Sequence, residues 1–214
     1  MPGVPLAPLP VVRHTRFLFV SDTSERNDAL SEVLSTTGQD LRCVPLQHAL
    51  DGRSLLDADV ILLSVDIDHW LNALRRLEPA LAGLVVVWCA VTGAQRPTPS
   101  LGSDSALANI SAALPAARVI GAFQQFGTDH LRLMTLGLLE TDGPVLGDDL
   151  EAADLIAALL DHVRGVTGVY AGSLRGAGAV EGIAALLDEV AQTAGRPVGF
   201  RLDAARGLVL LFGR

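Results

Sequence analysis

The stretch RFLFV-SDTSERN, residues 16–27, decides the fold class of this chain and limits what the chain can bind. Residues 16–20 have the apolar character of a buried strand, and a helical pattern follows over 28–37. In a dinucleotide-binding fold the turn between such a strand and helix is glycine-rich, because backbone amides contact a pyrophosphate at the helix N-terminus. This turn contains no glycine and carries two carboxylates, Asp22 and Glu25, so a phosphate would meet side chains and negative charge.

Apolar runs alternate with helical patterns along the rest of the chain, which predicts an α/β protein with a parallel sheet covered on both faces. Ser24 is expected to cap the first helix, and Pro79 to end the helix over 68–77. Residues 91–103 read as a loop rich in Thr, Gly, Pro and Ser. The predicted strands are 16–20, 41–44, 59–64, 84–88, 118–123, 143–147 and 167–170, with a final hairpin over 197–202 and 207–212. The predicted helices are 28–37, 68–77, 104–114, 129–139, 148–163 and 179–193.

The composition excludes several classes of function. The 214 residues carry a formal net charge of −8 and no basic cluster, which argues against nucleic acid or an anionic membrane as partner. All sixteen cationic residues are Arg, so lysine-based chemistry is absent. The five His are scattered without metal-ligand spacing, so no metal is expected. No apolar run reaches the roughly 18 residues needed to span a membrane.

The cysteines and the first residues indicate the compartment. Cys43 and Cys89 both lie in apolar, strand-like runs and are expected to be buried free thiols, which fits a reducing, cytoplasmic setting. Residues 1–14 are proline-rich and lack the features of a signal peptide, so they are expected to be a flexible leader.

Three stretches from Ala58 onward are similar to a known family. They are residues 58–65 (ADVILLSV), 114–123 (LPAARVIGAF) and 142–149 (DGPVLGDD), the last followed by YAGSL over 170–174 and by Val180-Glu181. The chain resembles the NADP-dependent reductases of the deazaflavin coenzyme F420. The resemblance implies a Rossmann-type, doubly wound, mostly parallel sheet with a C-terminal helix and β-hairpin extension. It divides the chain into a degenerate Rossmann-like domain (15–142) and a C-terminal α/β extension packed on the same sheet (143–214), and implies a homodimer.

The chain departs from this family at both phosphate-binding positions. The family's glycine-rich loop falls on residues 21–27, where Thr23 alone matches, and the residues that hold the 2′-phosphate of NADP fall on Pro45 and Leu46. Arg26 could hold one phosphate, but Asp22 and Glu25 oppose it, and an ion-paired surface turn is the favoured interpretation. If NADPH binds at all, the candidate residues are Thr23, Ser24 and Arg26.

The nicotinamide loop of the family supplies the candidate catalytic residues, Asp66 and His69. Asp66 stands where the family has a proline, at the carboxyl end of a strand where open α/β sheets bind ligands. It could act as an acid or a base if burial raises its pKa. Capping of the next helix by Asp66 or Asp68 is the alternative, and His69 could equally be an ordinary helix residue.

Two further strand ends supply candidate substrate-binding residues. Trp88 and Cys89 follow the fourth strand, and Gln124 and Gln125 follow the fifth. Trp88 could stack on a planar ligand or pack in the core, and an amide can donate and accept hydrogen bonds but cannot act as a base. The downstream pair Asp129-His130 is not expected to form a dyad, because adjacent helical residues do not face each other.

Three functions remain open. The favoured one is a cofactor-independent enzyme of small-molecule metabolism that performs proton transfer, isomerisation, cyclisation or dehydration in the old nicotinamide crevice. The second is an NADPH-dependent oxidoreductase with an atypical loop. The third is a non-catalytic partner of an intact reductase.

Overall fold

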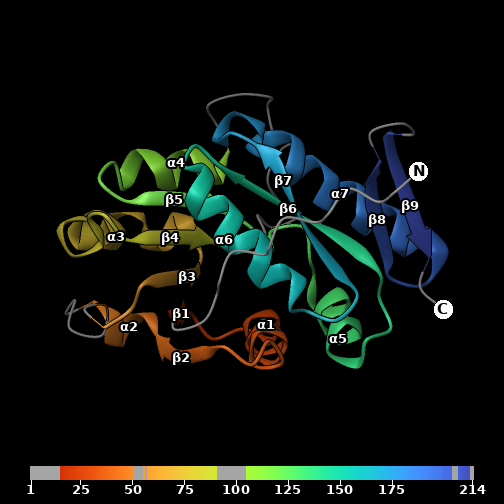
Figure 1. Cartoon of the computed structure of the whole chain (residues 1–214), viewed down its shortest axis with the longest axis horizontal. Helices are drawn as coiled ribbons and strands as arrows, with labels where there is room; N and C mark the ends of the chain where they lie inside the picture. The colour runs from red at the N-terminus through yellow and green to blue at the C-terminus, as the bar shows by residue number, and fades with distance from the viewer. Residues whose placement is uncertain (1–14, 51–54, 56, 91–104, 204–206, 213–214) are drawn as a thin grey trace, which may run out of the picture.

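Seven strands form the central sheet of the protein, in the order β2-β1-β3-β4-β5-β6-β7 (Figure 1). The computed structural model describes residues 15–50, 55, 57–90, 105–203 and 207–212. The strands of this sheet are β1 (Arg16–Ser21), β2 (Asp40–Pro45), β3 (Val60–Ser64), β4 (Val85–Trp88), β5 (Arg118–Gly121), β6 (Thr141–Gly147) and β7 (Val166–Gly172). All neighbours pair in parallel except β5 and β6, which are antiparallel. The Rossmann-type, doubly wound, mostly parallel sheet expected from the sequence is confirmed.

Helices cover both faces of this sheet, and successive strand residues point into two separate cores. The helices are α1 (Glu25–Ser35), α2 (Leu46–Ala49), α3 (Ile67–Leu81), α4 (Ala106–Ala113), α5 (Thr128–Leu136), α6 (Leu150–Asp161), the short 3-10 helix η2 (Leu174–Gly176) and α7 (Ala177–Ala194). Phe17 and Phe19 of β1 pack in the core that α1, α5 and α6 cover. Leu18 and Val20 pack in the opposite core, with residues of α2, α3, α4 and the start of α7. This alternation is the period of two that a strand imposes on its side chains.

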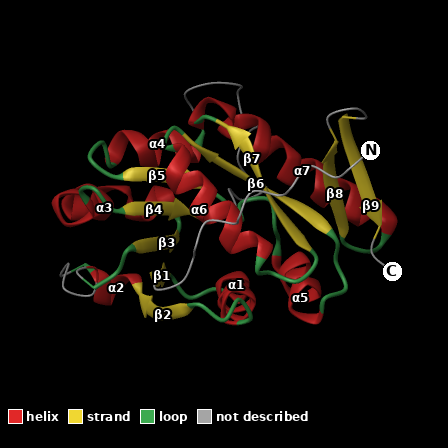
Figure 2. Cartoon of the chain, viewed as in Figure 1, coloured by secondary structure: helices red, strands yellow, loops and turns green. Residues whose placement is uncertain are grey.

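A separate two-stranded antiparallel sheet follows α7 and consists of β8 (Val198–Asp203) and β9 (Gly207–Phe212) (Figure 2). The start of β6 holds β8 in place. The Thr141 hydroxyl accepts a hydrogen bond from Phe200 N at 3.1 Å, and an Asp142 carboxylate oxygen accepts one from Leu202 N at 2.6 Å. Residues 204–206, at the tip of the expected hairpin, lie outside the described residues.

Most expected elements are present, with shifted ends. Ser24 caps α1 by accepting from Asn27 N, as expected, but α1 begins at Glu25, three residues earlier than the sequence suggested. The expectation that Pro79 ends its helix is wrong, because α3 continues to Leu81 with Pro79 inside it. Pro79 is exposed, so water can bond the carbonyl that loses its amide partner. The helices α2 and η2 were not expected, and the predicted leader (1–14) and loop (91–103) lie outside the described residues.

The prediction of two buried thiols is wrong for one of them. Both cysteines are free, but Cys43 is exposed and only Cys89 is buried. Cys43 lies in β2, which is the edge strand of the sheet, whereas Cys89 follows the central strand β4. No described helix is both long and apolar enough to cross a membrane, and no group of potential metal ligands occurs among the described residues.

Candidate functional site

The loops at the carboxyl ends of β1, β3, β4 and β5 meet at the place where this fold class binds ligands. Strand β1 lies between β2 and β3. The chain therefore runs from β1 to one side of the sheet, to form β2, and then crosses to the other side of β1, to form β3. Ligands of open α/β sheets bind in the crevice that such a switch creates. We call the region formed by residues 21–27, 64–66, 88–89 and 122–126 the strand-end crevice.

The side chain of Arg26 spans the strand-end crevice. Its Nε donates to Phe126 O at 2.9 Å, and Nη1 donates to the hydroxyl of Ser64 at 3.1 Å. Its Nη2 donates to Cys89 O at 2.7 Å and to Phe123 O at 2.9 Å. A single guanidinium therefore joins the first turn of α1 to the ends of β3 and β4 and to the loop after β5.

The environment of Arg26 corrects the sequence-based interpretation of an ion-paired surface turn. Its four hydrogen-bond partners are three carbonyls and a hydroxyl, not carboxylates. Burial lowers the pKa of Arg26 to about 10, so the guanidinium stays charged at neutral pH. Burial also raises the pKa of the Cys89 thiol to about 12, despite the nearby cation, so this thiol stays protonated and unreactive.

Asn27 closes the crevice beside Arg26, at the position of the last glycine of the family loop. Its Nδ2 donates to Asp22 O, Asp22 Oδ1 and Ser64 O at 2.8–3.0 Å, and its Oδ1 accepts from the Ser64 hydroxyl at 2.6 Å. The other oxygen of Asp22 accepts from Asp66 N at 3.0 Å. A dense set of side-chain hydrogen bonds thus takes the place of the bare backbone that a diphosphate requires.

Glu25 is turned away from this network. It forms an ion pair with Arg132 of α5, across the surface between α1 and α5. The two carboxylates of the turn therefore differ in role. Asp22 accepts hydrogen bonds within the turn and from Asp66 N, whereas Glu25 pairs α1 with α5.

The six residues that the sequence proposed as one site differ in burial. Asp66 is exposed, and the side chains of residues 67–70, which include His69, lie outside what the structure describes. Trp88, Cys89, Gln124 and Gln125 are all buried, with at most 3% of each residue exposed. The role of all six residues in catalysis or substrate binding stays a prediction.

Several buried polar atoms beside the crevice have no hydrogen-bond partner among the described residues. They are Trp88 Nε1, Gln124 Oε1 and both amide atoms of Gln125. Each such atom costs about 1–3 kcal/mol of stability. The same loop holds Phe123 at a φ of 63°, a left-handed conformation that is rare for a side chain of this size. Such unpaired groups and such a strained backbone make this loop a candidate part of a functional site.

A cleft of about 210 Å³ lies between β1, α1 and β2, where a dinucleotide fold holds the adenosine half of its cofactor. Thr23, Asp28 and Cys43 line it together with Pro45. The expected candidate Thr23 therefore faces open space, whereas Ser24 is used as the cap of α1. None of the described residues that line this cleft is an arginine or a histidine, so none of them provides a positive charge for a 2′-phosphate.

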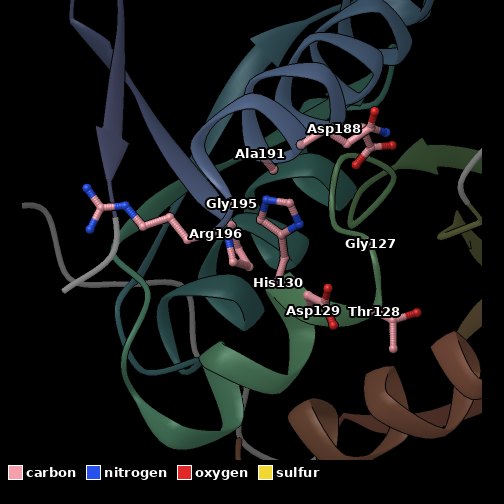
Figure 3. A pocket seen from close by; sticks show the side chains of 10 residues that line it. Gly127, Thr128, Asp129, His130, Asp188, Ala191, Gly195 and Arg196 are labelled. Carbon is pink, nitrogen blue, oxygen red and sulfur yellow. The ribbon is translucent and has the colours of Figure 1, made fainter.

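A second hollow, of about 450 Å³, lies between the N-terminus of α5 and the C-terminal part of α7 (Figure 3). Gly127, His130 and Asp188 line it, and Arg196 and Asp129 lie at its sides. We call it the α5–α7 hollow. In the sequence only Asp129 stands next to His130, and no pattern links His130 to Asp188, which is 58 residues away.

The fold and the strand-end crevice define a Rossmann-type α/β class of protein. No family model matches the chain, and no curated protein matches it. Among solved structures the chain is similar to a candidate F420-dependent NADP reductase from Arthrobacter sp. FB24. The similarity has a TM-score of 0.67, at 17% identity over 84% of this chain and 95% of the other.

Two further structures extend this similarity. A hypothetical protein, SMa0349, from Sinorhizobium meliloti has a TM-score of 0.58 at 20% identity, over 76% of this chain and 87% of the other. An imine reductase variant from Myxococcus stipitatus, in complex with NAD+, also has a TM-score of 0.58, at 14% identity over 85% and 62%. Identities this low establish the shared fold, and the expected resemblance to the F420-dependent reductases is confirmed at that level.

The residues present do not fit the diphosphate of NADP in the manner of this class. The loop after β1 supplies side chains where the fold class supplies glycine amides, and Arg26 and Asn27 occupy the strand-end crevice with internal hydrogen bonds.

Proposed function

We propose that this protein is an enzyme with a reductase fold that does not bind NADPH in the manner usual for that fold. It acts on a small molecule by proton transfer rather than hydride transfer. The observation that carries the proposal is the guanidinium of Arg26, which donates four hydrogen bonds across the crevice a cofactor would enter. The proposal includes a homodimer in the cytoplasm, with a small-molecule substrate and without a nucleic acid or membrane partner.

The energetics of Arg26 support this proposal. A hydrogen bond to a charged group contributes about 1.5–3 kcal/mol, so moving the guanidinium aside costs several kcal/mol. Micromolar binding of a cofactor supplies only about 8 kcal/mol in total. A dinucleotide that had to displace Arg26, without gaining glycine amides in return, would lose most of its affinity.

A calorimetric titration with NADPH tests the proposal. We expect no micromolar binding by the wild-type protein, and stronger binding by Arg26→Gly, which removes the side chain that spans the crevice. Arg132→Ala is the matched control, because it removes one arginine that is half exposed and pairs with Glu25 instead. Micromolar NADPH binding by the wild type, in the groove beside Thr23, would overturn the proposal.

The second candidate is an NADPH-dependent oxidoreductase. The cleft beside Thr23 favours it, because about 210 Å³ of open space remains where the adenosine half would lie. A neighbour of the same fold also carries NAD+. The same titration separates the two functions, since this one requires binding by the wild type. The remaining alternative, a non-catalytic partner of an intact reductase, predicts a heteromeric mass in light scattering instead of a homodimer.

A further inference from the structure

The α5–α7 hollow contains a histidine whose two ring nitrogens have different surroundings. His130 is 3% exposed, and its Nε2 lies 3.0 Å from Val198 O at the start of β8. A carbonyl oxygen only accepts, so Nε2 carries a proton and donates it. Burial lowers the pKa of His130, which favours the neutral ring. In the neutral ring with Nε2 protonated, Nδ1 carries a lone pair and is a base.

Nδ1 of His130 and a carboxylate oxygen of Asp188 converge on one point of the hollow. A Cβ atom placed on Gly127 would lie 3.7 Å from His130 Nδ1 and 3.8 Å from Asp188 Oδ1. Burial raises the pKa of Asp188, while the nearby His130 opposes that change. The absence of a side chain on Gly127 keeps the space between these two titratable groups open (Figure 3).

The start of α5 adds hydrogen-bond donors to the same space. Gly127 is the N-cap residue of α5 and provides no side-chain cap. The first amides of a helix have no partner within the helix, and the helix dipole makes this end electropositive. The charged groups around the hollow are Asp129 on α5, Asp188 on α7 and Arg196 just after α7. An oxygen atom with partial negative charge would therefore be favoured at the start of α5, next to the base.

We propose that the α5–α7 hollow is an acid–base site for a small molecule that carries a carbonyl or carboxylate group. The oxygen of the ligand lies at the N-terminus of α5, and an acidic C–H bond beside the carbonyl faces Nδ1 of His130. This inference rests on the proposed function, because it gives proton transfer a location. It also moves the chemistry from the strand-end crevice to a place that neither the sequence nor the fold comparison assigns.

The step balances without an external oxidant or reductant. Nδ1 takes the proton from the carbon, the C–H electron pair forms a C=C bond, and the carbonyl π electrons move to the oxygen at α5. The carboxylate of Asp188 stabilises the imidazolium that forms. In a substrate with a C=C bond next to the acidic carbon, the enolate is a dienolate. The imidazolium then gives its proton to the far carbon of that C=C unit, the double bond shifts into conjugation, and the C=O bond re-forms. The product is an isomer of the substrate.

Binding is tested with acetate and pyruvate as probes, followed by nitrogen-15 NMR of the His130 ring and of the amides of residues 128–130. We expect saturable shifts in the wild type. Gly127→Ala should weaken binding by about tenfold or more, because its methyl group fills the convergence point at ordinary contact distances and strains nothing. Gly182→Ala of α7 is the matched control, since a Cβ there meets nothing within 4 Å. An absence of shifts, or equal affinities for both variants, would overturn the inference.

Catalytic competence is tested by deuterium exchange into pyruvate in heavy water. We expect the wild type to accelerate exchange and His130→Gln, whose amide can still donate to Val198 O, to lose the acceleration. If the rate of deuterium exchange were the same in His130→Gln as in the wild type, His130 would not be the acid–base residue. Failure here is distinct from failure of the proposed function, which is decided by NADPH binding at the crevice. A wild type that binds NADPH tightly and still shows acetate shifts keeps the hollow but loses the proposed function.

Discussion

The strand-end crevice and the α5–α7 hollow are adjacent in the chain and opposite in character. Phe126 accepts a hydrogen bond from Arg26 in the crevice, and the next residue, Gly127, lines the hollow. In the crevice a permanent cation donates four hydrogen bonds to three carbonyl groups and a hydroxyl of the protein itself. In the hollow two titratable groups face open space, and both of their pKa values are moved by burial toward the neutral form. A charged residue at the usual ligand-binding place of a fold can therefore serve to hold loops together, and the acid–base site that we propose begins at the next residue of the chain.

Removing the guanidinium of Arg26 is the strongest test of the structural half of this comparison. Arg26→Ala leaves three carbonyls and the Ser64 hydroxyl without their donor in a buried place. We expect a loss of about 3–5 kcal/mol in the free energy of unfolding, measured by urea denaturation. Arg132→Ala should cost less than about 1 kcal/mol, because its ion pair with Glu25 is exposed. Equal losses in the two variants would mean that Arg26 does not hold the crevice closed.

Two substitutions decide which region carries the chemistry. His130→Gln should reduce turnover by about 10²–10⁴-fold, the usual contribution of a general base. Asp66→Asn should leave most of the turnover, because this carboxylate is exposed at the crevice and lies outside the hollow. The measurement is the rate of deuterium exchange into pyruvate, with circular dichroism to check that both variants fold. The reverse ranking would restore Asp66 as the acid–base residue that the sequence predicted.

The sequence predicted the fold because that information is local. The apolar runs of β3 and β4 and the amphipathic pattern of α6 each lie within a short window, and periodicity identifies them. The inward direction of Arg26 could not be predicted in this way. Its partners are 38 to 100 residues away, and three of the four are backbone carbonyls, which every residue has. The pair His130 and Asp188 could not be predicted for the same reason, because the two residues are far apart in the sequence and come together only where α7 packs beside α5.

The pH dependence of stability distinguishes the two groups in the hollow. The folded-state pKa of His130 lies below its ordinary value, so the folded protein binds fewer protons than the unfolded chain as the pH falls below about 6.5. Stability from this group is present above that pH and is lost as the pH falls toward the folded-state pKa. We expect the melting temperature of the wild type to fall between about pH 7 and pH 5 by more than that of His130→Gln. Asp188 acts with the opposite sign, because its raised pKa favours folding at acidic pH and this contribution is lost as the pH rises.

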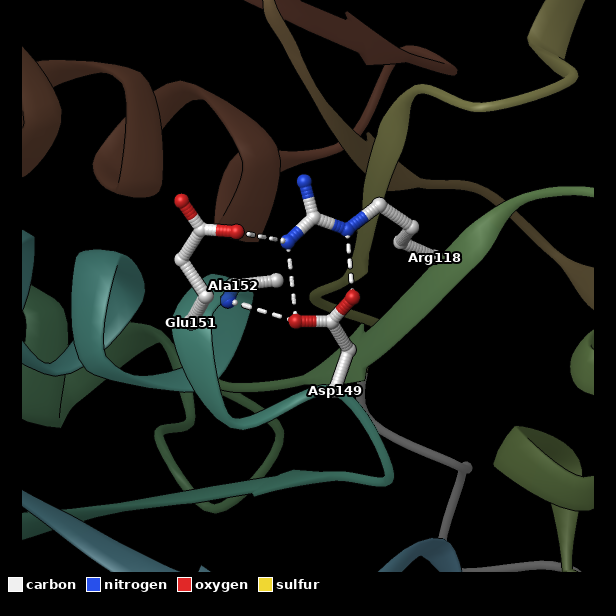
Figure 4. Close-up of polar contacts among 4 residues, drawn as sticks. All are labelled: Arg118, Asp149, Glu151 and Ala152. Carbon is white, nitrogen blue, oxygen red and sulfur yellow. Dashed lines mark hydrogen bonds and ion pairs between the residues drawn. The ribbon is translucent and has the colours of Figure 1, made fainter.

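A partly exposed charge cluster provides a reference for the two buried regions. Arg118 of β5 donates to both carboxylate oxygens of Asp149 at 2.5 and 2.8 Å and to Glu151 at 3.0 Å, while Asp149 caps α6 by accepting from Ala152 N (Figure 4). The side chains of Arg118 and Asp149 are about one third exposed, so solvent screens the pair.

The hydrogen bonds from Arg118 lower the pKa of Asp149 to about 2, so its stabilising contribution is present above the ordinary value and disappears as the pH falls toward 2. We expect Arg118→Met to cost no more than about 1 kcal/mol at neutral pH, in urea denaturation, and to flatten the loss of stability below about pH 4. Arg118→Met should not change how the free energy of unfolding depends on pH between pH 5 and 7, because we attribute that dependence to His130. If Arg118→Met lost as much free energy of unfolding as Arg26→Ala, solvent exposure would not explain which charged contacts stabilise this protein. The contrast between the surface cluster and the strand-end crevice would then be wrong.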